Sequence, residues 1–144
     1  MRLLIKLVIV CVVIFVAIQF VPYGEHTNPP VVSEPAWDSP QTRELFVRAC
    51  ANCHSNETIW PWYSTYAPAS WMVAFDVEEG RKHFNVSMWG EQEMNFGEAA
   101  ADMLQVGAMP PWYYLPAHPE AKLSFEEKNA LVNGLRKTFS GEGN

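Results

Sequence analysis

Two cysteines and a histidine lie within five residues of one another, in the run Cys50-Ala-Asn-Cys53-His54. The spacing Cys-x-x-Cys-His is the attachment signature of c-type haem. Two thiols three residues apart in a helical turn lie on one side of the backbone, where each can add to one vinyl group of the haem. The histidine that follows can offer a ring nitrogen to the iron as the proximal axial ligand. The motif therefore predicts one haem c, attached covalently through Cys50 and Cys53, with His54 as a metal ligand.

The iron of such a site has a sixth position, and Met109 is the main candidate for the distal ligand. It follows Gly107, which is typical of a helix end, and two prolines after it stiffen the loop that would present the sulfur. A thioether ligand favours ferrous iron and raises the reduction potential. His118 is the alternative distal ligand, and a pair of histidines would give a lower potential. The pattern favours Met109 and leaves His118 open.

Two other chemistries use similar residues. A thioredoxin-like dithiol needs a βαβ context, and no such context is visible in this sequence. A structural zinc site could use both cysteines of the motif with two of His54, His83 and His118, but it lacks a second closely spaced ligand pair. Haem attachment is therefore the favoured interpretation.

The chain starts with two basic residues and a long apolar run. Arg2 and Lys6 stand before or within an apolar stretch that reaches Val21. This layout predicts a signal anchor or transmembrane helix over residues 1–21, with a cleaved signal peptide as the alternative. Positive charges ahead of the apolar run would place the rest of the chain outside the cytoplasm, in the periplasm or at the outer face of the cell membrane.

The segment that follows is rich in proline. Residues 22–40 predict an extended linker, and residues 41–140 predict one haem-binding domain. Ser39-Pro40 indicates the start of a helix that delivers Cys50 at its end. Further helices are predicted from Pro68 to Glu79, closed by Gly80, and roughly from Glu91 to Val106.

A last helix is predicted to start at Ser124, because Ser124-x-x-Glu127 has the form of a capping box. No strand alternation of useful length and no internal repeat is visible. The predicted fold class is therefore all-α, a small cytochrome c-like helical domain with long loops around one covalent haem, preceded by the transmembrane helix.

Charge narrows the range of partners. The 144 residues carry a formal net charge of −6, and all sixteen acidic residues lie after the apolar run. Such a body is repelled by phosphate backbones, which argues against nucleic acid, and is steered toward redox partner proteins with a basic docking surface. Arg81-Lys82-His83 is the basic cluster of the body, and it could bind haem propionates or form a solvated patch.

Beyond the haem motif, several longer runs are similar to the bacterial haem-binding domain family of cytochrome c-type proteins. The resemblance covers about residues 40 to 138, nearly all of the chain after the apolar run. It rests on Cys50-Ala-Asn-Cys53-His54-Ser-Asn-Glu-Thr58, Trp60-Pro-Trp-Tyr63, Gly80-Arg-Lys-His-Phe-Asn85 with Ser87 and Trp89, Gly107-Ala-Met109-Pro-Pro111, and His118-Pro119 before Lys122-Leu-Ser124. The resemblance implies covalent haem c on the two cysteines, iron on His54 and an exported cytochrome c-like domain.

These observations predict a monohaem carrier of single electrons, with no catalytic residues and no substrate turned over. A haem-based sensor or ligand-binding module is the second hypothesis, and it needs an open or easily displaced sixth position. A small haem peroxidase is the third, although the sequence offers no convincing distal acid–base pair. Carbon monoxide binding distinguishes the first hypothesis from the other two.

Overall fold

The computed structural model describes residues 1–93 and 95–140, which form six α-helices and three short 3-10 helices. Within these residues there is no strand, only one isolated bridge between Ser33 and Met88, in agreement with the predicted all-helical class. The α-helices are α1 (Arg2–Ile18), α2 (Pro40–Ala49), α3 (Ala51–His54), α4 (Ala69–His83), α5 (Ala100–Gln105) and α6 (Phe125–Phe139). The 3-10 helices are η1 (Trp62–Thr65), η2 (Gly97–Ala99) and η3 (Pro119–Ala121).

The N-terminal helix is shorter than the sequence predicted. Helix α1 has 17 residues, which at 1.5 Å per residue makes it about 26 Å long, less than the ~30 Å of a bilayer's hydrocarbon core. Beyond it, the Gln19 side chain donates to the carbonyls of Phe15 and Ala67. Among the described residues, none of the helices combines the length and apolar character needed to cross a membrane. The predicted transmembrane helix over residues 1–21, and with it the membrane-anchored periplasmic localisation, is wrong.

Two helix starts were predicted correctly, because their signals are local. Ser39 caps α2, with its hydroxyl accepting from the Thr42 N–H at 3.2 Å, and Pro40 takes the first helical position. At the start of α6, the Ser124 hydroxyl accepts from the Glu127 N–H, and the Glu127 carboxylate accepts from the Ser124 N–H at 2.7 Å. This is the reciprocal capping box that the sequence predicted.

Two other helices differ from their predicted extents. Helix α4 continues through Gly80 to His83, because this glycine serves close packing and not helix termination. A Cβ at Gly80 would lie 2.5 Å from the Cys53 carbonyl oxygen, so only a glycine lets α3 and α4 approach this closely. The helix predicted over 91–106 is reduced to η2 and α5, with Gly97 pressed against the Trp89 ring. Residue 94, which was part of that prediction, lies outside the described residues.

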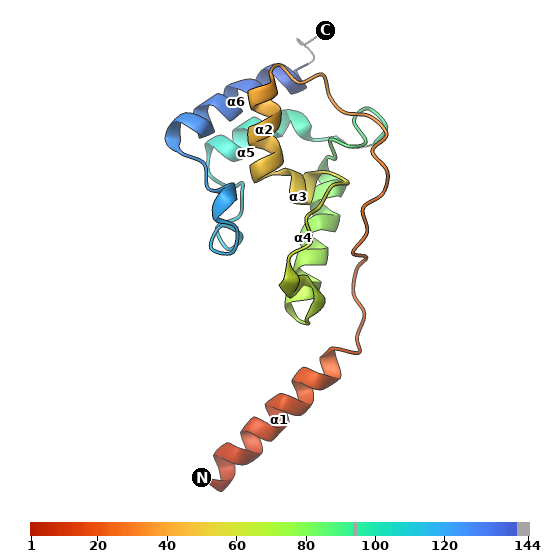
Figure 1. The fold of residues 1–144 in the computed structure, drawn as a ribbon, viewed down its shortest axis with the longest axis vertical. Coiled ribbons are helices and arrows are strands. Elements are labelled where there is room, and N and C mark those ends of the chain that lie inside the picture. The colour runs from red at the N-terminus through yellow and green to blue at the C-terminus, as the bar shows by residue number, and fades with distance from the viewer. Residues whose placement is uncertain (94, 141–144) are drawn as a thin grey trace.

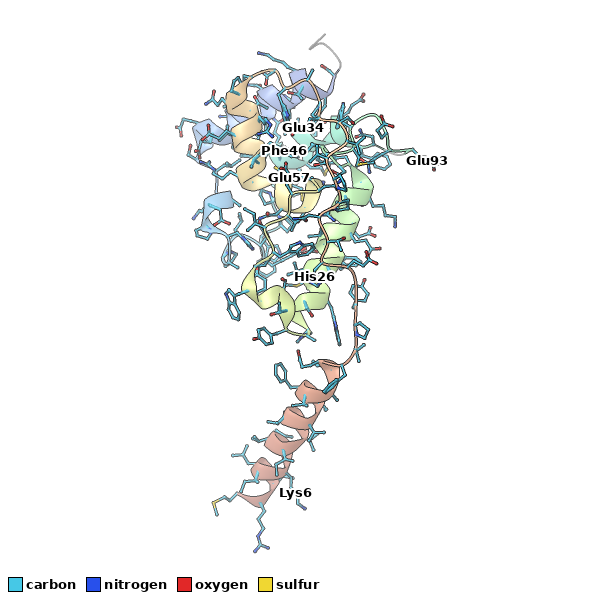
Figure 2. All side chains as sticks on the ribbon, turned by 45° about the vertical axis from the view of Figure 1, so that its right-hand side comes forward. Lys6, His26, Glu34, Phe46, Glu57 and Glu93 are labelled. Atoms are coloured by element: carbon cyan, nitrogen blue, oxygen red, sulfur yellow. The ribbon has the colours of Figure 1, made fainter. Side chains whose placement is uncertain are left out.

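The hydrophobic core lies where α2, α5 and α6 pack together at one end of the body (Figure 1). Phe46 of α2 is completely buried at its centre, whereas Lys6 projects from α1 far from it (Figure 2). The rings of Phe46, Phe84 and Phe139 contact one another with tilted or edge geometry. Through Phe84, which follows α4, this core reaches the segment that carries the motif.

The proline-rich segment between α1 and α2 lies along the body (Figure 1). The Arg81 guanidinium anchors it by donating to the Thr27 carbonyl at 2.9 Å and to the Asn28 side chain at 3.1 Å. The same guanidinium donates to the Ser55 carbonyl and the Thr58 hydroxyl, directly after α3. All four acceptors lie within hydrogen-bond distance, so Arg81 joins three segments that are distant in sequence.

We expect Gly80→Ala to destabilise the protein by about 1–3 kcal/mol, because its Cβ would overlap the Cys53 backbone. At an ordinary position inside a helix, the same change would stabilise by about 1 kcal/mol. Urea unfolding followed by circular dichroism measures the difference. Glu78→Ala, on the exposed face of the same helix, serves as control and should change the free energy of unfolding by less than about 0.5 kcal/mol. A stabilised Gly80→Ala variant would contradict the close packing of α3 on α4.

We expect Arg81→Lys to lower the free energy of unfolding by about 2–3 kcal/mol, because a single ammonium cannot reach the four acceptors that the guanidinium joins. Arg43→Lys is the matched control, since Arg43 makes an exposed two-pronged ion pair with Glu34. Its effect should stay below about 1 kcal/mol. Equal losses in the two variants would show that Arg81 has no special anchoring role.

Candidate functional site

The cysteine–histidine motif forms one continuous helical turn at the junction of α2 and α3. The Cys50 N–H donates to the Phe46 carbonyl at 2.7 Å and so ends α2. The Cys50 carbonyl accepts from the N–H groups of Cys53 and His54, at 3.1 and 3.0 Å. Both thiols are free. The helical turn that the spacing predicted is therefore present.

The His54 ring is held by the residue that follows α4. It stacks on the Phe84 ring with centroids 4.1 Å apart and planes at 13°, and its Nδ1 lies 3.2 Å from the Phe84 carbonyl oxygen. Because a carbonyl only accepts, this contact favours the tautomer with the proton on Nδ1, in which the lone pair of Nε2 can bind a metal. Burial lowers the pKa of His54 to about 4, so the imidazole is neutral at pH 7, which is the form that binds metals.

The two thiols are also uncharged at neutral pH. Burial raises the pKa of Cys50 to about 12 and that of Cys53 to about 11. A structural zinc site needs thiolates and further ligands close by. The described part of the chain contains no cluster of three or more His, Cys, Asp or Glu side chains that could hold a metal ion. The zinc interpretation therefore receives no support from the fold.

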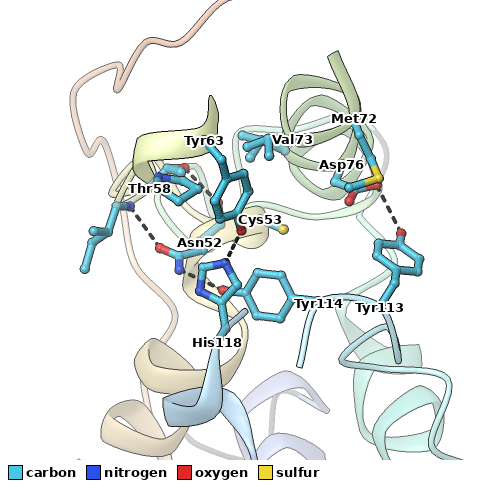
Figure 3. A pocket seen from close by; sticks show the side chains of 13 residues that line it. Asn52, Cys53, Thr58, Tyr63, Met72, Val73, Asp76, Tyr113, Tyr114 and His118 are labelled. Carbon is cyan, nitrogen blue, oxygen red and sulfur yellow. Dashed lines mark hydrogen bonds between the residues drawn. The ribbon is translucent and has the colours of Figure 1, made fainter. Parts of the chain in front are cut away.

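Cys53 faces a small cavity of about 40 Å³ between α3, α4 and the loop that precedes η3 (Figure 3). His118 lines the same cavity, so the structure brings this candidate ligand to the attachment site. Aromatic and polar side chains make up much of the remaining wall: Asn52, Thr58, Tyr63, Asp76, Tyr113 and Tyr114, with Met72 beside them. A space of this volume holds about one water molecule. Haem attached to Cys53 therefore requires side chains of this wall to move outward.

His118 is buried and uses both of its ring nitrogens. Its Nε2 lies 2.7 Å from the Tyr63 hydroxyl, and its Nδ1 lies 2.9 Å from the Glu120 carboxylate. Its ring stacks on Tyr114 with centroids 3.9 Å apart, and the Tyr114 hydroxyl accepts from the Asn52 amide at 2.8 Å. The network joins the loop before η3 to α3, and Figure 3 shows His118 between the two tyrosines.

Met109, the main distal candidate, lies apart from this cavity. It stands in the loop after α5, where Gly107 has the positive φ of +77° that favours glycine. Its N–H donates to the Met103 carbonyl at 3.2 Å, and its side chain is 41% exposed. The structure therefore brings Cys53 and His118 to one cavity, whereas Met109 and His54 are not among the residues that line it.

A second, larger depression of about 710 Å³ lies on the other side of His118 and is lined in part by Arg43 and Arg48. Arg48 forms an ion pair with Glu127, but its Nε is buried without a hydrogen-bond partner among the described residues. This N–H is therefore an unused donor inside the structure. Arg81, which the sequence suggested for haem propionates, uses its guanidinium on the four acceptors described above.

The donor set fits a covalently held haem. Two neutral thiols and a neutral imidazole with a free Nε2 stand in one turn, and an arginine with an unused donor lies nearby. The sequence predicted this donor set because the residue types and their spacing are local. It did not identify Tyr63, Asp76 or Tyr113 as lining the site, because only the fold brings them together.

Comparison with known proteins identifies a haem-binding domain in this chain. A model of the haem-binding domain family matches residues 13–137, which include the cysteine–histidine turn and every residue that lines the cavity. No curated protein and no solved structure matched the chain. Because the family model spans most of the sequence, the chain belongs to the haem-binding domain family and is a haem-binding protein.

Proposed function

We propose that this protein is a carrier of single electrons, with one haem c held by thioether bonds to Cys50 and Cys53. The observation that carries the proposal is the turn Cys50–His54, in which both thiols are free and the imidazole is neutral. Bound there, haem supplies a one-electron couple between ferric and ferrous iron. The chain's own part is to hold the group, fix the axial ligand and shield the site.

His54 is the proposed proximal ligand through Nε2. The hydrogen bond from its Nδ1–H to the Phe84 carbonyl fixes the tautomer and limits ring rotation. Such a bond also increases the basicity of the ligating nitrogen. The stack against Phe84 limits tilting of the ring. These contacts keep the ligand in one orientation in both oxidation states, which favours fast electron exchange.

Met109 is the proposed distal ligand, and the contacts of His118 support this choice. Ligation by His118 would remove its hydrogen bond to Tyr63 or to Glu120 and break its stack on Tyr114. Met109 has a half-exposed side chain on a loop, and a thioether gives up no strong hydrogen bond when it binds iron. Ligation by Met109 therefore breaks fewer interactions than ligation by His118.

The redox partner is proposed to be a protein with a basic docking surface. The chain carries a formal net charge of −6, and its acidic residues all follow α1. Opposite charge steers association and increases the rate of encounter at low ionic strength.

A second candidate function rests on the cavity beside Cys53. There His118 is hydrogen-bonded to a tyrosine and a carboxylate, and a polar histidine of this kind near an open iron would suit a small peroxidase or a ligand-binding module. This alternative requires that Met109 leave the sixth position open. Reaction with carbon monoxide and turnover of peroxide therefore separate it from electron transfer.

Covalent attachment has a direct test in the mass of the denatured polypeptide. The wild-type chain should keep its haem through acid–acetone extraction, and mass spectrometry should show one haem added. Cys50→Ser and Cys53→Ser should each lose one thioether bond, and the double variant should release the haem completely. Cys11→Ser, which lies in α1 far from the motif, is the control and should retain it. Complete release of haem from the wild type would contradict a c-type site.

Distal ligation is tested by adding carbon monoxide to the reduced, haem-loaded protein. The wild type should keep a low-spin spectrum, whereas Met109→Leu should bind the gas rapidly and have a lower reduction potential. Met103→Leu is the matched control, because Met103 is 43% exposed and Met109 is 41% exposed. A wild-type protein that binds the gas at once would favour the peroxidase or sensor. A Met109→Leu variant with unchanged spectrum and potential would rule out Met109 as ligand.

A further inference from the structure

The Phe84 carbonyl that binds the His54 ring belongs to a peptide group that is bound at both of its ends. Its oxygen lies 3.2 Å from His54 Nδ1, and the N–H of the same peptide group, on Asn85, donates to the Gln92 side-chain oxygen at 2.7 Å. A peptide group is planar, so partners at its N–H and at its C=O together fix its orientation. The Gln92 side chain therefore helps to decide where the Phe84 carbonyl points.

The Gln92 amide takes the place of a hydrogen bond of helix α4. Its nitrogen donates to the Arg81 carbonyl at 2.8 Å, while its oxygen accepts from the Asn85 N–H. These two backbone groups are four positions apart and would bind each other if the helix continued. Instead α4 ends at His83, and Phe84 is extended, with φ −163° and ψ 151°. The inserted amide lets the chain leave the helix without an unpaired N–H or C=O at this point.

We propose that Gln92 is a positioning residue for the proximal ligand, because its amide ends α4 and turns the Phe84 carbonyl toward Nδ1 of His54. This inference rests on the proposed function, in which His54 is the ligand, and it adds a residue that acts on the ring through the Phe84–Asn85 peptide group. Hydrogen bonds in a chain polarise one another, so the bond from Asn85 to Gln92 makes the carbonyl a stronger acceptor. A stronger bond at Nδ1 fixes the tautomer and increases the basicity of Nε2.

Other contacts hold the same segment in place when the glutamine is changed. The Val86 N–H donates to the His54 carbonyl at 2.9 Å. Asn85 is buried, and its side chain donates to the Asn56 side chain at 2.7 Å and accepts from the Ser87 N–H at 2.9 Å. Loss of the glutamine amide therefore frees one peptide group to rotate and leaves the segment attached to the body.

The first test is the tautomer of the His54 ring in the haem-free chain of 144 residues, read from its ring nitrogen shifts by NMR at neutral pH. The wild type should carry the proton on Nδ1. Gln92→Ala should shift the ratio of the two tautomers toward the Nε2–H form by roughly two- to tenfold, the factor that corresponds to the net worth of one hydrogen bond.

Ser87→Ala is the matched control, because the Ser87 hydroxyl accepts from the Asn56 N–H at 3.0 Å in the same buried network. Each variant removes the side-chain acceptor of one backbone N–H, but only Gln92→Ala does so on the peptide group that binds His54. The control should lose similar stability in urea and keep the wild-type tautomer. An unchanged tautomer in Gln92→Ala, or an equal change in both variants, would overturn the proposal.

Gln92→Glu separates the two ends of the amide. It keeps an oxygen for the Asn85 N–H and loses the donor to the Arg81 carbonyl. Since the proposal places the effect on the Asn85 N–H, this variant should retain the Nδ1–H tautomer. A change as large as that in Gln92→Ala would count against the proposal.

The second test is the reduction potential of the haem-loaded protein. A more basic axial nitrogen favours the ferric state, so a weaker bond at Nδ1 should raise the potential. Gln92→Ala should therefore have a higher potential than the wild type, and Ser87→Ala an unchanged one. A potential that falls or stays in place in Gln92→Ala would contradict the role of Gln92.

The two hypotheses fail in different ways. If the loaded protein shows no reversible couple, electron transfer fails, and the tautomer in the haem-free chain still tests the role of Gln92. A reversible couple with the same potential in the wild type and in Gln92→Ala, together with an unchanged tautomer, overturns the role of Gln92 and leaves electron transfer standing.

Discussion

The site depends on how the single turn of α3 is held in place by other segments. An isolated helix of four residues is not stable in water. The conformational entropy lost on forming the first turn exceeds the free energy that its hydrogen bonds provide. Helix α4 and the residues after it supply what is missing. Gly80 allows backbone contact with Cys53, the Phe84 carbonyl binds the His54 ring, and the Val86 N–H donates to the His54 carbonyl at 2.9 Å. The orientation of the motif is therefore set by residues 80–86 as much as by its own sequence.

This dependence explains which parts of the structure the sequence could predict. The motif and the helix starts at Ser39 and Ser124 were predictable, because each involves residues within four positions of one another. Gly80 was interpreted as a helix end, since a glycine near a run of charged residues has the same appearance whether it stops a helix or lets another backbone approach. The apolar N-terminal run suggested a membrane span, but its helix stops after 17 residues.

The sequence could not predict which residues line the cavity, because their contacts are long-range. The hydrogen bond between Tyr63 and His118 joins residues 55 positions apart, and that between Asn52 and Tyr114 spans 62. Such pairs depend on how the loop before η3 folds back over α3, and no local periodicity encodes that path. Arg81 shows the same limit, because its basic neighbours suggested propionate binding, whereas its guanidinium anchors the proline-rich segment. A cluster of basic residues in the sequence does not show which acceptors an arginine will bind in the fold.

The choice between Met109 and His118 turns on what each would leave behind on binding iron. A His118 ring that moved to the metal would give up its contact with the Tyr63 hydroxyl or the Glu120 carboxylate and would break its stack on the Tyr114 ring. The Met109 side chain has no comparable interaction to lose. Ligation by Met109 therefore costs less free energy than ligation by His118. With methionine as ligand, His118 keeps its place in the cavity wall and holds Tyr63 and Tyr114 against α3.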